Sequence, residues 1–455
     1  MDSLFGFIAP IFWGFVLLSA LVFVHEGGHF LAARACGVRV TEFFLGMPCR
    51  FNLHHVSRRI GTKFGITPIL LGGYAEICGM DPTEVACAPA VLAYVHEHGV
   101  ATVAQIAQDL ELSEAEALDA CALLMGWGSV APRYDEAAGE RPGGSEYPST
   151  YAAMPRDAAG STIFDGRRFE RAGATQEGER WVPPMGQEAF YAQERSRTYI
   201  GKGFWKRAFM LLAGIGVNIL TGFLLIVAVY SALGTQVVVD TNRVGAVVDH
   251  SPAAEAGLAA GDAISSVDGA VTDSWSAILE ALSSAQPGDR ISLGVTDADG
   301  QQRSVTVELG EDGLLGIEGT QETVRLSPLD SCRIALDSIA QTAQGVARLL
   351  NPSQTMEVLD SSTSIVGISV MSAQAAAAGP AVFLSFAALI SFSLGFMNLL
   401  PIPPLDGGRL LIEAIQALTR RTVPLRVQSA ISIVGIVLFG ALFLYMFRAD
   451  VLRFL

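Results

Sequence analysis

The chain has 455 residues, of which 51% are hydrophobic and 16% are charged. Soluble domains carry about 25% charged residues, so this composition, with a mean hydropathy of +0.41, excludes an ordinary soluble protein and indicates a polytopic membrane protein. The net charge of −15 arises partly from one acidic segment and does not indicate a nucleic-acid partner.

Four segments, at about 7–33, 205–233, 378–400 and 428–447, are apolar and long enough to cross a bilayer, which takes roughly 20 residues per helix. The first has Asp2 and no Lys or Arg before its apolar run, and it contains polar residues. We therefore expect it to remain as a span and not to be removed as a secretory signal.

The positive charges predict the orientation of these four transmembrane helices. Lys and Arg residues follow the first span, precede the second and lie between the third and fourth, whereas residues 235–325 carry 15 Asp and Glu against 4 Lys and Arg. The positive-inside rule places 34–204 in the cytosol and the N-terminus and 235–375 outside. This topology predicts a multi-pass protein of the cytoplasmic membrane.

The first span contains Val24-His25-Glu26-Gly27-Gly28-His29. Helix residues four apart share a face, so both imidazoles can reach one metal ion. The spacing matches the HExxH zinc motif, in which the glutamate acts on the metal-bound water, and ionisable groups inside a span usually indicate function. The alternative is that these side chains only hydrogen-bond neighbouring helices.

Residues 38–75 have a strand-like pattern at 39–44 and 62–69, followed by the turn Leu71-Gly72-Gly73-Tyr74. Exposed backbone is penalised in lipid, so these strands must pack on protein or line a cavity. We assign residues 1–80 to the first span and a membrane-associated β-hairpin or sheet.

Residues 81–135 predict a small winged-helix-like insert on the cytosolic side. Ser113 and Glu116 form a capping box that opens its third helix. The segment has nine Asp and Glu and one Arg, whereas a DNA-binding domain needs a basic face, so we expect a protein partner. Residues 136–190, rich in Gly, Pro, Arg and Glu, predict a flexible linker.

The second span belongs to residues 191–235. Residues 236–325 alternate like short strands and contain Ser251-Pro252-Ala253-Ala254-Glu255-Ala256-Gly257-Leu258, which closely resembles a PDZ domain of bacterial proteases. Such domains bind extended peptides by strand addition. Residues 326–377 predict amphipathic helices near the outer leaflet.

The last segment, 378–455, holds two spans and the run Asn398-Leu399-Leu400-Pro401-Ile402-Pro403-Pro404-Leu405-Asp406-Gly407-Gly408-Arg409. The three prolines must interrupt the helix, because each lacks a backbone N–H. The break lets Asp406 turn inward as a third metal ligand; a catalytic zinc usually has three protein ligands and one open position. Glu413 is the competing carboxylate, and Asp406 could instead only cap the helix that restarts there.

In this order, the HEGGH span, the Gly-Gly-Tyr turn, the PDZ-like segment and the Leu-Asp-Gly-Gly segment resemble the site-two protease family (peptidase family M50), of the bacterial regulator-of-sigma-E type. The resemblance covers about 1–78 and 186–455. It implies that His25, His29 and Asp406 bind Zn²⁺ and that Glu26 is the catalytic base. It also implies that Asn398 and the turn residues Gly72, Gly73 and Tyr74 hold an unwound substrate.

The resemblance predicts an intramembrane zinc metalloprotease that cleaves single-pass membrane proteins, such as anti-sigma factors after a first cut outside, with peptide C-termini bound at the PDZ domain. One alternative is a membrane-anchored sensor with PDZ and winged-helix domains and a structural metal. Another is a transcription regulator that acts through the insert, against which the acidic composition argues.

Gly214 and Asn218 of the second span match a small-residue motif that predicts helix packing.

Overall fold

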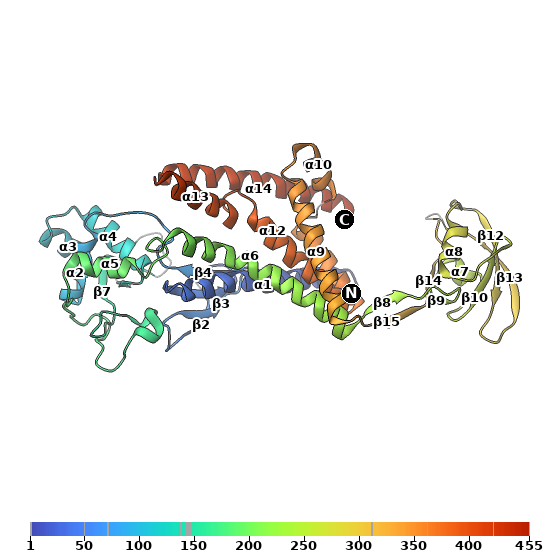
Figure 1. The fold of residues 1–455 in the computed structure, drawn as a ribbon, viewed down its shortest axis with the longest axis horizontal. Coiled ribbons are helices and arrows are strands. Elements are labelled where there is room, and N and C mark those ends of the chain that lie inside the picture. Colours follow the sequence, from blue (N-terminus) through green and yellow to red (C-terminus); the bar gives the residue numbers. More distant parts are fainter. Residues whose placement is uncertain are drawn as a thin grey trace. The chain divides into compact units, whose positions relative to one another are not determined.

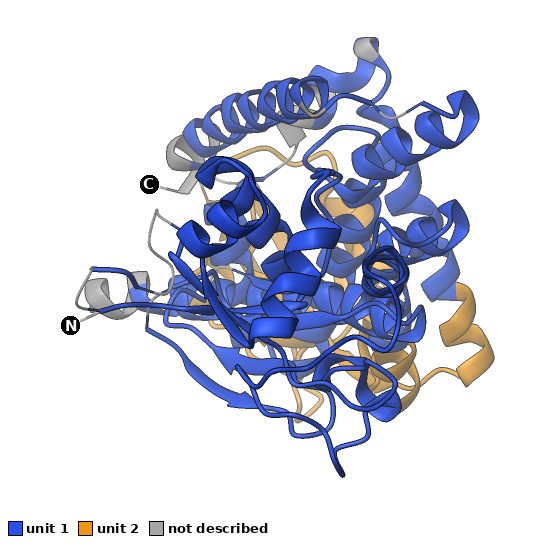
Figure 2. Ribbon diagram, turned by 90° about the vertical axis from the view of Figure 1, so that its left-hand side faces the viewer, with its two compact units in different colours: residues 1–226, 334–455 blue, residues 227–333 orange. Residues whose placement is uncertain are grey.

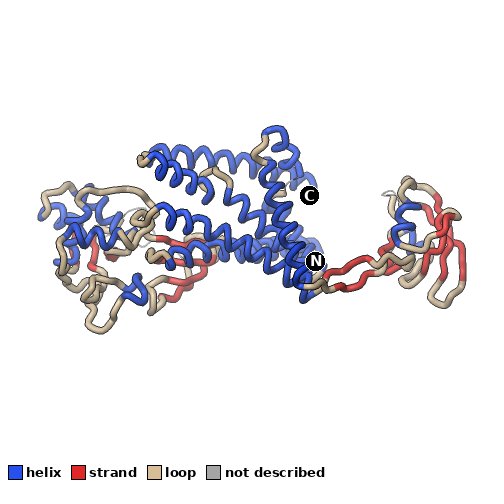
Figure 3. The backbone as a smooth tube through the Cα atoms, in the orientation of Figure 1, coloured by secondary structure: helices blue, strands red, loops and turns tan. Residues whose placement is uncertain are grey.

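The computed structural model describes residues 2–49, 51–70, 72–136, 139–141, 147–310, 313–361, 363–421 and 423–454 (Figure 1). It divides into two compact units, Met1–Ile226 with Ile334–Leu455, and Val227–Arg333, which Figure 2 distinguishes by colour. Long helices dominate the first unit, whereas short strands make up most of the second (Figure 3).

The four predicted membrane spans are confirmed. The described residues contain four helices that are long and apolar enough to cross a membrane: α1 (Asp2–Ala35), α6 (Phe204–Ala228, extended by a π-helical turn over Val229–Leu233), α12 (Pro380–Leu399) and α14 (Leu425–Phe454). Three further helices precede α12: α9 (Pro328–Arg348), α10 (Pro352–Ser361) and the short apolar α11 (Ile365–Ala378). Among these, α11 packs so closely along α1 that a Cβ at Gly14 would collide with Ser369.

The predicted break after the third span is also present. Helix α12 ends at Leu399 and α13 (Asp406–Thr419) begins at Asp406, with the three prolines between them. A Cβ at Gly407 or Gly408 would collide with the backbone of this proline segment. The two glycines therefore allow the loop to fold back on the first turn of α13, which fixes where Asp406 projects.

The strands after α1 form a four-stranded sheet in the order β2-β3-β1-β4. The two predicted strands, β1 (Val40–Leu45) and β3 (Lys63–Ile66), pair in parallel, because β2 (Leu53–Val56) lies in their connection and pairs antiparallel with β3. The hairpin interpretation is therefore too simple. At the predicted turn the chain instead enters an edge strand, β4 (Gly73–Ile77), that pairs antiparallel with β1.

The insert contains three helices and a three-stranded antiparallel sheet in the order β5-β7-β6. Its elements are α2 (Ala88–His98), β5 (Val100–Thr102), α3 (Val103–Asp109), α4 (Glu114–Gly126), β6 (Val130–Arg133) and β7 (Thr150–Ala153). The capping box at Ser113 and Glu116 is confirmed.

The prediction of a flexible linker over 136–190 is wrong for its described part from 147 onward. This part supplies the central strand β7, a 3-10 helix (Ile163–Arg168) and the start of α5 (Gln187–Arg195). Arg156 is fully buried and donates hydrogen bonds to Glu194 Oε1 and Oε2, each at 2.9 Å. Arg39, the residue before β1, contacts the same carboxylate at 2.7 and 2.9 Å. The Gly-rich composition did not indicate this buried ion network, which connects the insert to the four-stranded sheet that contains β1.

The second unit has its own apolar core around Ile264, Ile278 and Leu293. Its elements are β8 (Thr235–Val238), β9 (Val244–Val247), α7 (Pro252–Glu255), β10 (Ala263–Val267), β11 (Ala270–Val271), α8 (Trp275–Leu282), β12 (Arg290–Thr296), β13 (Gln302–Glu308), β14 (Ile317–Gly319) and β15 (Gln321–Val324). Strands β11-β10-β12-β13 form one sheet, and β14 pairs with β9.

Candidate active site

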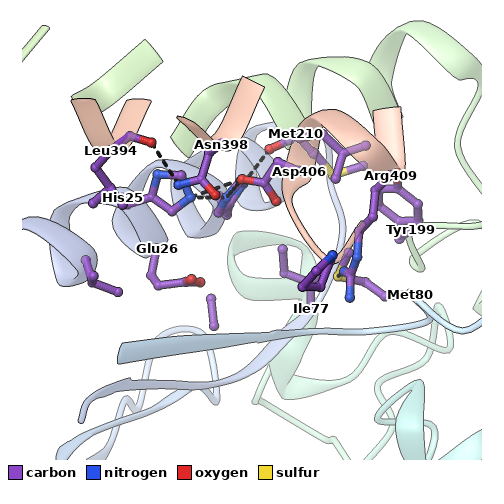
Figure 4. A pocket seen from close by; sticks show the side chains of 15 residues that line it. His25, Glu26, Ile77, Met80, Tyr199, Met210, Leu394, Asn398, Asp406 and Arg409 are labelled. Carbon is purple, nitrogen blue, oxygen red and sulfur yellow. Dashed lines mark hydrogen bonds and ion pairs between the residues drawn. The ribbon is translucent and has the colours of Figure 1, made fainter. Parts of the chain in front are cut away.

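Two helices bring three metal-binding side chains to one point (Figure 4). Nε2 of His25 and Nε2 of His29, from α1, lie 3.0 and 3.1 Å from Oδ2 of Asp406, at the start of α13. The two Nε2 atoms are 3.1 Å apart. Both imidazoles are buried. The structure therefore brings together the three side chains that the sequence predicted as ligands.

The hydrogen-bond chemistry of this cluster favours a cation at its centre. Nδ1 of His29 lies 2.7 Å from the carbonyl oxygen of Met210, which can only accept, so this nitrogen carries the proton. In the neutral ring, Nε2 then presents a lone pair to the Asp406 carboxylate. Two lone pairs at 3.1 Å repel each other unless a proton or a metal ion lies between them.

The same geometry fits zinc. An ion held tetrahedrally at about 2.0–2.1 Å from nitrogen and oxygen ligands separates those ligands by roughly 3.3 Å, close to the separations in this cluster. Two imidazoles and one carboxylate are a common ligand set for catalytic zinc. The bond from His29 Nδ1 to a backbone carbonyl is the typical support that orients a metal-binding ring.

The close approach of α1 and α6 at the site depends on two glycines. A Cβ at Gly28 would lie 2.6 Å from the carbonyl oxygen of Ala213, and one at Gly214 would lie 2.8 Å from His25 Cε1 and collide with His29 Nε2. The packing role predicted for Gly214 is consistent with this contact. Asn218 does more than pack, because its side-chain amide lies 3.2 Å from Nδ1 of His25.

A cavity of about 400 Å³ opens beside the three ligands. Glu26, the residue after His25, extends from α1 into this cavity on the side of the sheet (Figure 4). Asn398 also lines the cavity, and its amide donates to the carbonyl of Leu394 at 3.0 Å. Arg409 and Tyr199 line the wall as well, and the sequence pattern did not single out either residue.

The predicted substrate-binding turn lies elsewhere. Gly72, Gly73 and Tyr74 are not among the residues that line the cavity; the strand β4 contributes Ala75 and Ile77 instead. Side chains alternate along a strand, and Tyr74 points to the other face, where its hydroxyl donates to Glu42 Oε2 at 2.7 Å. The substrate-binding role of Gly72, Gly73 and Tyr74 therefore stays a prediction.

The competing roles for the carboxylates of α13 are not supported. Glu413 lies 3.0 Å from the guanidinium of Arg207 and thus forms an ion pair. Asp406 is the first residue of α13, and no side-chain capping bond is present at this helix start. The Asp406 carboxylate is therefore directed at the two histidines.

Comparisons with known proteins identify the family of this chain. The sequence profile of Peptidase family M50 matches residues 13–442. The chain is similar to a zinc metalloprotease RasP from Shouchella clausii, with 28% identity over 96% of both chains. It is also similar to the regulator of sigma-W protease RasP from Bacillus subtilis, with 26% identity over 98% of this chain and 99% of the relative. A putative zinc metalloprotease from Lactococcus lactis is 26% identical over 96% of this chain and 97% of its own.

Proposed function

This chain belongs to peptidase family M50 and is a zinc metalloprotease, and we propose that it cleaves single-pass membrane proteins within their spanning segments. Anti-sigma factors already trimmed outside the membrane are the proposed substrates, since one relative is named a regulator of sigma-W protease. The observation that carries the proposal is the meeting of His25, His29 and Asp406 beside Glu26 and an open cavity.

We assign the metal to His25, His29 and Asp406. When bound there, zinc supplies a Lewis acid that polarises the scissile carbonyl and makes a water molecule acidic. Glu26 accepts a proton from the attacking water and delivers it to the leaving amine nitrogen. Asn398, on the cavity wall, is placed to donate a hydrogen bond to the substrate backbone.

The substrate has to unwind before cleavage, because a helix hides its carbonyls in hydrogen bonds. Among the described strands, β4 lies at the edge of its sheet and pairs only with β1. Its residues Ala75 and Ile77 line the cavity. We propose that the unwound segment adds to the free edge of β4, which replaces the lost backbone bonds.

The second unit and the insert have proposed roles in partner binding. Within the described residues β14 pairs with β9 alone, so its other edge is free to receive a peptide C-terminus, as a PDZ domain would.

In the insert, the order helix–strand–helix–helix–strand–strand supports a winged-helix domain. Its acidic composition supports a protein partner over nucleic acid. The proposed topology places the insert in the cytosol and the PDZ domain outside.

The test is a Glu26→Gln variant, reconstituted with a single-pass substrate. Loss of the base is expected to lower cleavage by about 10²–10⁴-fold while the bound zinc remains. Full cleavage by this variant would show that Glu26 is not the base. If the protein were instead a membrane-anchored sensor with a structural metal, the unmodified protein would bind zinc but cleave no substrate, with or without a chelator. A structural zinc site would also need a fourth protein ligand.

A further inference from the structure

A second cavity, of about 450 Å³, lies at the N-terminal end of α6. Four cationic side chains line it: Arg168, Arg197, Lys202 and Lys206. Trp205 and Phe204, at the start of the apolar helix, form part of the same wall. The cavity does not share a lining residue with the active-site cavity.

Three of the four positive charges of this cavity are not neutralised within the described part of the chain. Arg168, Lys202 and Lys206 form no ion pair there. The nearby Asp165 is already bound to Arg39 at 2.8 Å and lies 3.7 Å from Arg197. Burial, together with the neighbouring cations Lys206 and Arg168, lowers the pKa of Lys202. An anion in the cavity would relieve this repulsion.

The surroundings of the cavity fit the boundary of a membrane. Trp205 is 82% exposed, and aromatic residues of this kind concentrate at membrane interfaces. One turn further along α6, Phe209 is 54% exposed, and Leu212, two turns from Trp205, is 39% exposed. A cationic cavity thus continues into an apolar helix face that can lie against acyl chains.

We propose that this cavity binds the phosphate headgroup of an anionic phospholipid, with the acyl chains along the exposed face of α6. Basic pockets at the cytoplasmic ends of spanning helices are suited to such headgroups. A free phosphate ion would use the cations alone, whereas a lipid also uses Trp205 and Phe209. The combination of charge and exposed apolar surface therefore favours the lipid.

The bound lipid would also contact the segment that holds the sheet at the active site. Arg197 accepts a hydrogen bond from the backbone N–H of Arg39, at 2.9 Å, and the N–H of Tyr199 donates to the carbonyl of Cys78, at 2.8 Å. Tyr199 lines the catalytic cavity. The headgroup would thus stabilise the connection between α6 and the ends of β1 and β4.

The experiment measures lipid retention by the full chain, independently of proteolysis. The protein is equilibrated in nanodiscs of phosphatidylcholine mixed with phosphatidylglycerol, extracted, and its bound lipids are counted by native mass spectrometry. The double variant Lys202→Gln/Lys206→Gln is expected to bind phosphatidylglycerol about 25-fold more weakly, from roughly 5-fold per basic residue. The variant Lys202→Arg/Lys206→Arg keeps the charge and should retain the lipid.

A matched control removes two exposed arginines outside the cavity, Arg171→Gln/Arg180→Gln, with the same change in net charge. This control should retain phosphatidylglycerol like the unmodified protein. If Lys202→Gln/Lys206→Gln retained as much phosphatidylglycerol as the unmodified protein, the proposed binding site would be wrong. It would also be wrong if Arg171→Gln/Arg180→Gln lost as much lipid as the Lys202→Gln/Lys206→Gln variant. Displacement of the lipid by millimolar inorganic phosphate would overturn its assignment to a phospholipid.

Discussion

The side-chain amide nitrogen of Asn218 lies 3.2 Å from Nδ1 of His25, on the far side of the ring from Asp406. The Asn218 Oδ1 atom is buried and has no hydrogen-bond partner among the described residues in this arrangement. Oxygen and nitrogen of an amide can be exchanged by a half-turn. With the oxygen facing the ring, Asn218 accepts the Nδ1 proton, and Nε2 of His25 keeps its lone pair for the metal.

Replacing Asn218 by Ala is therefore expected to weaken zinc binding by about 10–100-fold, the usual effect of removing a group that orients a metal ligand. Chelator competition with the purified protein measures this change. Asn398→Ala is the matched comparison, because Asn398 lines the cavity but bonds to Leu394. Asn398→Ala should slow cleavage and leave the zinc affinity unchanged. If the Asn218→Ala and Asn398→Ala variants bound zinc with equal affinity, the proposed role of Asn218 would be contradicted.

Gly214 offers a second test of how the ligands are held. In Gly214→Ala the new methyl group would meet both imidazoles, so the rings have to move and zinc affinity should fall at least 10-fold. Gly216→Ala, two residues further along α6, places its methyl group in open space and should bind zinc normally. Metal content after dialysis distinguishes the two. Normal zinc binding by Gly214→Ala would mean that the rings do not occupy this position.

The spans and the ligands were predictable because they depend on local patterns. The length of the apolar segments predicted α1, α6, α12 and α14, and the four-residue spacing of His25 and His29 predicted two of the three metal ligands. Asp406 could be selected because three prolines precede it and break the helix. Each of these signals lies within about 20 residues of sequence.

The features that the sequence did not predict depend on contacts between distant segments. The parallel pairing of β1 with β3 results from an intervening strand, and no local pattern sets that register. The carbonyl of Met210, which orients His29, is backbone and therefore independent of residue type. The ion network of Arg39, Arg156 and Glu194 joins residues up to 155 apart.

This network gives a prediction about the insert. Burial by itself would raise the pKa of Glu194, but Arg156 and Arg39 hold it well below its usual range. Arg39 keeps its ion pair with Asp165 in Glu194→Gln, but the buried guanidinium of Arg156 loses the carboxylate that neutralises it. This variant is therefore expected to destabilise the insert by about 3–5 kcal/mol. Hydrogen exchange of the insert amides in the full chain measures this loss. Glu188→Gln, on the exposed side of α5, should change exchange little; similar effects of both variants would contradict the network.

His96 gives the insert a pH dependence of stability. Burial, together with the nearby Arg156 cation, lowers the pKa of His96 to about 3, and its Nε2 accepts a hydrogen bond from Arg156 at 3.0 Å. The unfolded histidine titrates near pH 6.5, so between these values the unfolded state binds the extra proton. Stability is therefore complete above about pH 6.5 and falls as the pH decreases, by about 2 kcal/mol between roughly pH 7 and pH 5.

Hydrogen exchange of the insert over this range tests the assignment. His96→Gln lowers the stability at neutral pH, since it disturbs the bond to Arg156, but it should remove the pH dependence that the histidine causes. His98, two residues along α2, is exposed and stacks on Tyr94 at 4.0 Å. His98→Gln should keep the full pH dependence, because it leaves His96 and its hydrogen bond to Arg156 in place. An unchanged slope in His96→Gln would assign the acid sensitivity to other groups.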